Sequence, residues 1–145
     1  MPSNVICLRG ETPLVTASDW NNGISDYIDS IPDWEGGQIT VPNNGSIGAA
    51  FYQPRPFSAS RDVTILDPLK PISPAAALFI CTVIRKEANR YNYARKWTIG
   101  RMRETILKLP SSGGKPDFMK MEKLVLALPL GWSLAQPHAT SIAQL

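Results

Sequence analysis

The periodicity of the apolar residues changes at Ser73 and Pro74, and this change constrains the fold more than any other feature. Before it, short apolar runs are separated by Gly, Asn and Pro turns, a pattern typical of β-strands. After it, apolar residues recur at helical spacing. Ser at the N-cap and Pro at the first helical position are signals with which helices begin. The sequence therefore predicts an α+β protein in which strands come first and a long helix follows.

Five strands are predicted before the change of period. Each is a short apolar run next to a turn signal, and "WNNG" at 20–23 is the clearest turn because Asn and Gly tolerate a positive φ. In the third strand, Ile39 and Val41 share one face. The five predicted strands cover residues 14–17, 24–29, 36–45, 48–54 and 61–68. A sixth strand is predicted at 105–110, followed by a loop at 111–115.

Two helices are predicted after the change of period. The longer begins at Ser73 or Pro74 and runs to about Tyr91, with one apolar and one basic side. Its apolar stripe consists of Ala77, Ile80, Ile84, Ala88 and Tyr91. Its opposite side carries Thr82, Arg85, Lys86, Asn89, Arg90 and Tyr93. The second helix covers 116–129, and the residues expected to face inward are Phe118, Met121, Leu124, Val125 and Leu128.

Positive charge is concentrated in one short segment. Residues 85–108 carry eight basic and two acidic side chains, whereas residues 1–84 carry four basic and eight acidic ones. The stretch "RKEANRYNYARKWTIGRMR" at 85–103 combines seven Lys and Arg residues with two Tyr and one Trp. Such a footprint is expected of a surface that contacts a polyanion. The alternative is a solvated helix face with its following loop, which is what most charge runs are.

Two segments supply candidates for nucleic-acid contacts. Arg matches phosphate or guanine, and Asn matches the edge of adenine. In "PNNGSIG" at 42–48, Asn43, Asn44 and Ser46 lie at the tip of a predicted loop. The alternative interpretation is that this loop is only a tight turn between strands. Trp97 has two interpretations, because a Trp in a basic segment either packs on sugars and bases or anchors the loop in the core.

The sequence offers little for catalysis or for a cofactor. The loop at 42–48 lacks the Gly-Lys-Ser/Thr ending of a P-loop, and His138 is the only histidine. Asp62 and Asp67 resemble a nuclease pair, but no Lys follows them at the short spacing of such sites. We therefore expect no catalytic residue, no metal ion and no cofactor.

The composition favours a cytoplasmic protein that does not span a membrane. The longest dense apolar run, at 75–84, has ten residues and is too short to cross a bilayer. The first thirteen residues lack the apolar core of a signal peptide. Cys7 and Cys81 form no CxxC pattern and are expected to be reduced thiols, with Cys81 a small core residue.

Several segments, in their order and spacing, resemble a known family. The most specific are Gly37–Ile39, Asn44–Gly48, Phe51 with Tyr52, Tyr91–Trp97 and Thr105–Pro110. No single segment is diagnostic, but over about residues 13–129 the chain resembles the DNA-specificity (target recognition) domain of type I restriction–modification specificity subunits. The type IIB-like and fused relatives are the most similar members.

The resemblance implies a curved, partly barrel-like mixed β-sheet with helices packed on one side. Domains of this family do no chemistry: they read one half of a bipartite site in double-stranded DNA. They place methyltransferase and endonuclease subunits on that site. Together with the basic segment, the resemblance suggests these DNA-binding residues: Asn43, Asn44, Ser46, Arg61, Arg85, Lys86, Arg90, Tyr93, Arg95, Lys96, Arg101 and Arg103.

The chain differs from a full specificity subunit in having one domain, expected at 1–129, where a full subunit has two. The long helices that separate the two domains are represented only by a stub at 119–129, and the tail at 130–145 has no assigned role. We expect a half-subunit, a shortened gene product or a free-standing domain. A second copy of the chain is kept as a candidate partner. The alternative function is that of a relic or regulatory protein whose basic face binds an acidic protein partner.

Overall fold

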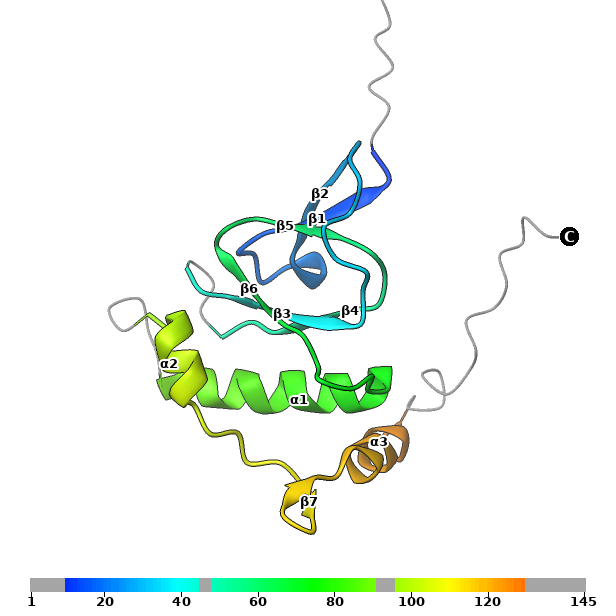
Figure 1. The fold of residues 1–145 in the computed structure, drawn as a ribbon, viewed down its shortest axis with the longest axis vertical. Helices are drawn as coiled ribbons and strands as arrows, with labels where there is room; N and C mark the ends of the chain where they lie inside the picture. The colour runs from blue at the N-terminus through cyan, green and yellow to red at the C-terminus, as the bar shows by residue number, and fades with distance from the viewer. Residues whose placement is uncertain (1–9, 45–47, 91–95, 130–145) are drawn as a thin grey trace, which may run out of the picture.

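The computed structural model describes residues 10–44, 48–90 and 96–129, and these residues form an α+β fold. Two small β-sheets lie one above the other, and the helices lie on the far side of the lower sheet (Figure 1). The predicted α+β class, with a mixed sheet and helices to one side, is confirmed. The strands are divided between two three-stranded sheets, and the described residues form no closed barrel.

The first sheet has the strand order β2-β1-β5 and is mixed. Strands β1 (Thr12–Val15) and β2 (Ile24–Ile28) are antiparallel, while β5 (Ser58–Ala59) pairs with β1 in parallel. The β1–β2 connection contains a short 3₁₀-helix, η1 (Asn21–Gly23). Its three residues all have positive φ, which confirms the turn predicted from "WNNG" and explains the need for Asn and Gly. Strand β5 was not predicted, because two residues give no recognisable alternation.

The second sheet has the order β4-β3-β6 and is antiparallel. Strand β3 (Gln38–Pro42) pairs with both β4 (Phe51–Gln53) and β6 (Val63–Leu66), so all five of its residues are buried. Ile39 and Val41 belong to one core cluster, which confirms that they share a face. The predicted strands at 36–45, 48–54 and 61–68 are therefore present, with shorter ends.

Helix α1 (Pro74–Glu87) covers the second sheet. It begins as predicted: the Ser73 side chain accepts a hydrogen bond from the amide of Ala76, and Pro74 occupies the first turn. The helix continues as a 3₁₀ turn, η2 (Ala88–Arg90), while Tyr91 lies outside the described residues. The predicted apolar stripe faces the sheet, where Ala77, Ile84 and Ala88 are buried and Ile80 packs against the core.

The segment after α1 differs from the prediction. Residues 99–104 form a helix, α2 (Ile99–Glu104), in the basic segment, where only a loop was expected after the long helix. Residues 105–110 form no strand, so that prediction was wrong. Their burial alternates as it would in a strand, with Ile106 exposed and Leu107 packed against the core, but no neighbouring strand of the described chain pairs with them. Alternation reports which face is buried and says nothing about whether a hydrogen-bonding partner exists.

A small hairpin and a third helix complete the described chain. Strands β7 (Ser111–Ser112) and β8 (Lys115–Pro116) pair across Gly113 and Gly114 in a segment that was predicted as a loop. Helix α3 (Phe118–Leu126) starts at Asp117 and confirms the second predicted helix. It lies against α1 on the side away from the sheet (Figure 1).

The expected inward face of α3 is only partly buried. Met121 is fully buried and Val125 is half-buried, but Phe118, Leu124 and Leu128 are exposed. A helix that packs against one neighbour buries the centre of its apolar stripe and leaves the flanks in solvent. The expectation that all five residues face inward was therefore wrong for three of them. No helix within the described ranges is long and apolar enough to cross a membrane.

Candidate nucleic-acid interface

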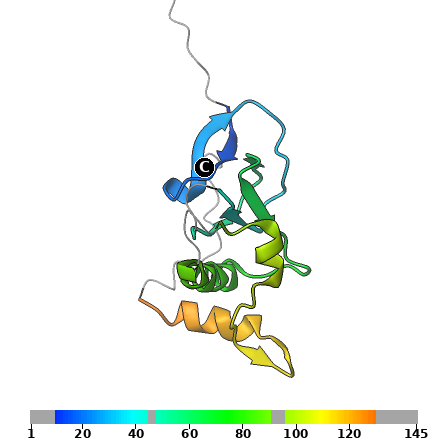
Figure 2. The same cartoon turned by 90° about the vertical axis from the view of Figure 1, so that its left-hand side faces the viewer.

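Segments far apart in the sequence meet at one end of the molecule. The C-terminal end of α1 and helix α2 lie at this end, close to the start of β6, on the left-hand side of Figure 1. Figure 2 looks onto this end, with α1 nearly end-on and α2 beside it. We call it the basic end and define it by the described cationic residues that it gathers: Arg61, Arg85, Lys86, Arg90, Lys96, Arg101 and Arg103.

The loop after β3 is fixed to the turn before β6. The backbone amide of Asn43 donates to the carbonyl of Asp62 at 3.0 Å. The Asn43 side-chain amide donates to Thr64 Oγ1 at 3.1 Å, and that of Asn44 to Asp62 Oδ1 at 3.4 Å. These bonds place Arg61, which is exposed, beside the loop. Within the described residues, no donor engages the carbonyl oxygen of either Asn side chain, and Ser46 lies outside these residues.

Gly48 brings the other side of the same loop against the end of α1. Its φ is +99°, and a Cβ built on it would lie 2.5 Å from the Cβ of Ala88. A side chain at this position would be strained and would also push the loop away from η2. The glycine that the sequence offered as part of a turn is thus the point where the loop and the helix end touch.

Arg85 is turned back onto the protein. Its Nε and Nη2 both donate to the carbonyl oxygen of Ala50, at 3.2 and 3.0 Å. The guanidinium carbon lies 4.9 Å from the centre of the Phe51 ring, within the range of a cation–π contact. Arg85 therefore links the C-terminal half of α1 to the start of β4, although its position on the helix is on the exposed side.

Other cations of the basic end differ in how they are held. Arg90 Nε lies 3.2 Å from Glu87 Oε2, and the Arg90 side chain is 71% exposed. This pair spans one turn and holds the guanidinium at the surface. Within the described ranges, no hydrogen bond or ion pair engages the side chains of Arg61, Lys86 and Arg103, all of which are exposed. These three are the cations best placed to exchange water for phosphate.

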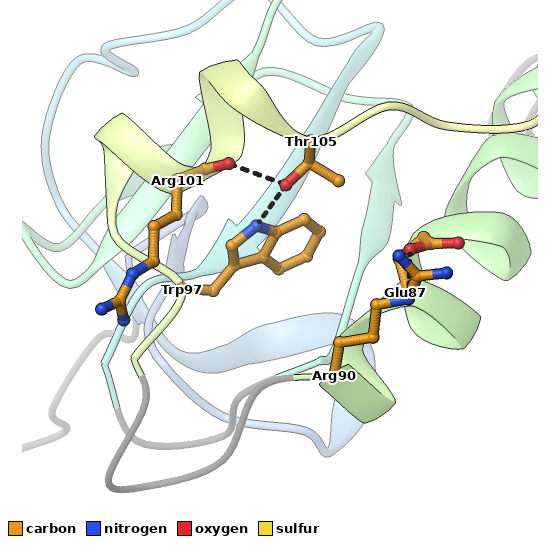
Figure 3. Close-up of polar contacts among 5 residues, drawn as sticks. All are labelled: Glu87, Arg90, Trp97, Arg101 and Thr105. Atoms are coloured by element: carbon orange, nitrogen blue, oxygen red, sulfur yellow. Dashed lines mark hydrogen bonds and ion pairs between the residues drawn. The ribbon is translucent and has the colours of Figure 1, made fainter.

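Helix α2 is attached to the core through Trp97. The Trp97 ring is 3% exposed, and its Nε1 donates to Thr105 Oγ1 at 3.0 Å. Thr105 Oγ1 donates in turn to the carbonyl of Arg101 at 2.7 Å (Figure 3). Arg101 Nη1 donates to the carbonyl of Lys96 at 2.6 Å. Of the two interpretations of Trp97, the core anchor is therefore the one that the structure bears out. Tyr93 and Arg95 lie outside the described residues.

The acidic residues do not converge on a site. Asp62 precedes β6 and Asp67 follows it, so the two stand at opposite ends of a strand. Asp62 accepts from Asn44, and Asp67 accepts from Gln38 Nε2 at 3.4 Å. Within residues 10–44, 48–90 and 96–129, no three His, Cys, Asp or Glu side chains are grouped so as to hold a metal ion.

Cys81 is part of the core beneath the basic end. It is buried within the described structure and packs with Ile39, Val41 and Ala77 in the cluster between α1 and the second sheet. Burial raises the pKa of its thiol to about 12, and the nearby Arg85 charge offsets part of this rise. The thiol is therefore protonated and unreactive at neutral pH, as expected of a small core residue.

A family model described as the type I restriction modification DNA specificity domain matches residues 1–122 of the chain. The chain belongs to this family. The predicted resemblance is thereby confirmed.

A curated relative agrees with this assignment. The specificity domain is 34% identical over 123 residues to the protein of Heyndrickxia coagulans named "Type II restriction enzyme BgcI specificity subunit S.BcgI". The match covers 82% of this chain and 36% of the relative, so the chain spans about a third of that relative's length. No solved structure matches the specificity domain.

Sequence reasoning identified the cations of the basic end and missed the residues that position them. Thr105 and Gly48 were named only as ends of family segments, and helix α2 was not predicted, although the signal for α2 is present. Thr98 is its N-cap and accepts from the amide of Arg101, the third residue of the helix. A Thr three residues before a helical amide is a recognisable start, but the glycine that follows at position 100 favoured a loop.

Proposed function

We propose that this specificity domain recognises double-stranded DNA through its basic end and reads one part of a longer site. The observation that carries the proposal is the gathering of cations from three separated segments, the turn at Arg61, the end of α1 and helix α2, at one end of the fold. Three of these cations have no partner among the described residues. Membership of the DNA specificity family supports DNA over other polyanions as the ligand.

The proposed contacts divide by type. Arg61, Lys86, Arg90 and Arg103 are exposed cations that suit phosphate oxygens, and contacts of this kind fix register without reading sequence. Asn43 and Asn44 stand at a loop tip beside them and are candidates for base edges. Of the other predicted contacts, Lys96 and Arg101 flank the Trp97 anchor, and Ser46, Tyr93 and Arg95 stay predictions.

The proposed role is that of a non-catalytic module. In this role the domain, expected at 1–129, directs methyltransferase and endonuclease subunits to a DNA site. A second copy of the chain is one way to recognise the second half of such a site. Support comes from the relative, whose name describes a specificity subunit of a restriction enzyme. DNA cleavage with Mg²⁺ by the purified chain, lost in Asp62→Ala, would contradict this part of the proposal.

Salt dependence of binding tests the proposal. Fluorescence anisotropy with a labelled duplex at several salt concentrations should give an affinity that falls steeply, with a log–log slope of about −0.9 per neutralised phosphate. An acidic protein such as a polyglutamate chain serves as the competitor for the alternative function. If the chain binds no duplex at low salt, or if polyglutamate displaces the duplex at equal charge concentration, DNA is not the ligand.

A further inference from the structure

Helix α2 does not hold itself in place. It has six residues, none of them buried, and isolated helices shorter than ~12–15 residues are marginal in water. The Thr98 cap satisfies one amide, but this local bond does not connect the helix to the rest of the protein. Contacts with the rest of the protein must therefore set where Arg101 and Arg103 stand: Met102 of the helix packs against the core cluster, and residues on either side of the helix connect it further.

Trp97 and Thr105 provide that connection, because they flank α2 on both sides in the sequence. Trp97 belongs to the same core cluster as Val41 and Ile84, so the segment that enters α2 is fixed to the second sheet and to α1. Its indole N–H is inside the protein, where an unsatisfied donor is costly, and Thr105 Oγ1 is the acceptor. Through this bond the residue that ends α2 is tied to the residue that precedes its start (Figure 3).

The connection reaches the charged groups in two further steps. The Thr105 hydroxyl donates its own hydrogen to the carbonyl of Arg101, within α2. The Arg101 guanidinium donates to the carbonyl of Lys96, next to Trp97. The indole and the hydroxyl thus hold the backbone of Arg101, and a separate hydrogen bond holds its guanidinium against the residue before Trp97. Arg103, further along the helix, is exposed.

We propose that Trp97 and Thr105 are positioning residues of the DNA interface: their hydrogen bond presents Arg101 and Arg103 of α2 as one preorganised phosphate contact. Neither residue touches DNA itself. The inference rests on the proposed function and goes beyond it, because it assigns part of the binding affinity to the uncharged hydroxyl group of Thr105. Preorganised cations lose less conformational entropy when they bind.

The decisive variant is Thr105→Val, with Thr105→Ser as its matched control. Val keeps the branched shape but offers no acceptor, whereas Ser restores the hydroxyl. With the proposed duplex titration, Thr105→Val should make the salt slope shallower by about 0.9 to 1.8, the contribution of one or two phosphates, and Ser should restore the wild-type slope. A residue with a purely structural role would change the melting temperature and leave the slope of the folded protein unchanged.

A double-mutant cycle separates positioning from general destabilisation. The double substitution Arg101→Gln and Arg103→Gln should weaken binding in the wild type and should cost at least threefold less in the Thr105→Val background. Equal costs in both backgrounds would overturn the inference. If Thr105→Val does not fold, Trp97→Phe removes the donor and keeps a buried ring, and the same cycle is then run with it.

The outcomes distinguish this inference from the proposed function. Wild-type binding together with an unchanged slope in a folded Thr105→Val protein would overturn the inference alone. Failure of the wild type to bind any duplex would overturn the proposed function, and the positioning role with it.

Discussion

The two ends of this molecule have opposite charge. The basic end gathers cations from the turn before β6, the end of α1 and helix α2. The β1–β2 end, at the top of Figure 1, belongs to a part of the chain, residues 10–54, that holds six Asp and Glu and no Lys or Arg. All six acids are exposed: Glu11, Asp19, Asp26, Asp29, Asp33 and Glu35.

Because the charges are separated in this way, a protein with a net charge of only +3 can present a strong local electrostatic field. A polyanion is attracted to one end and repelled by the other, so the charge distribution orients the domain before any contact forms. Total charge would give no such orientation. The basic end itself holds two kinds of cation: Arg85, Arg90 and Arg101 have partners within the protein, whereas Arg61, Lys86 and Arg103 have none among the described residues.

The largest expected effect comes from neutralising the unengaged cations. The triple variant Arg61→Gln, Lys86→Gln and Arg103→Gln should bind duplex DNA on the order of 10²-fold more weakly at physiological salt, because each phosphate contact contributes about 0.9 to the salt slope. Its melting temperature should match the wild type, since none of the three side chains has a partner among the described residues.

The matched control for that variant lies at the acidic end. Asp26→Asn, Asp29→Asn and Asp33→Asn together change the net charge by the same amount in the opposite direction, on exposed side chains. This control should bind DNA as well as the wild type or slightly better. If both triple variants lose affinity alike, the DNA-binding surface is not confined to the basic end.

The next effect concerns the contact between the loop and α1. Gly48→Ala introduces a Cβ 2.5 Å from Ala88 at a φ of +99° and should destabilise the fold by about 2–3 kcal/mol in urea unfolding. Gly37→Ala is the matched control, because Gly37 also has a positive φ, +86°, but its Cβ would meet nothing within 4 Å. Equal losses in the two variants would show that the contact with Ala88 contributes nothing.

A smaller effect distinguishes Arg85 from its neighbour. Arg85→Met removes two hydrogen bonds to the Ala50 carbonyl and the contact with Phe51, and should cost about 1–2 kcal/mol of stability. The salt slope of DNA binding should hardly change. Lys86→Met, one residue further on, should show the reverse. A changed slope with unchanged stability in Arg85→Met would mean that Arg85 leaves Ala50 to contact phosphate.

The last effect is a pH dependence that appears only in strongly alkaline solution. Burial raises the pKa of Cys81 from 9.0 to about 12, with the charge of Arg85 opposing this, so the folded protein keeps a proton that the unfolded chain releases. The stability associated with Cys81 is complete below pH 9.0 and is lost as the pH rises toward about 12. Over this pH range, the free energy of unfolding measured in urea should fall faster for the wild type than for Cys81→Ala. Parallel curves would contradict the assigned pKa.

The parts of the fold that the sequence predicted are those set by local chemistry. Ser73 and Pro74 define the start of α1, and Asn22 with Gly23 define the β1–β2 turn, because these residues favour one backbone geometry on their own. Two elements were not predicted correctly because their structure depends on contacts with distant parts of the chain. The alternating residues 105–110 have no strand to pair with in the described part of the chain, and α2 is attached to the core by Met102 and by the buried Trp97 beside it.

In the candidate site, too, local features could be predicted from the sequence and distant contacts could not. The sequence located the basic segment, but helical spacing gives only the direction in which a side chain leaves the backbone. Arg85, Lys86 and Arg90 leave α1 on its exposed side, yet the Arg85 side chain is long enough to return to Ala50. Which cations are held and which are available follows from the acceptors that folding brings near, and those lie 35 residues away in the case of Arg85.

Whether the basic end recognises DNA is tested most directly by selecting bound sequences from a pool of random duplexes with the purified wild-type chain. The triple variant Arg61→Gln, Lys86→Gln and Arg103→Gln is tested in parallel. We expect the wild type to enrich one short motif and the triple variant to retain little DNA at the same salt concentration. Retention of duplexes with no enriched motif would show a charged surface without recognition. Equal enrichment by both proteins would contradict the claim that the basic end binds DNA.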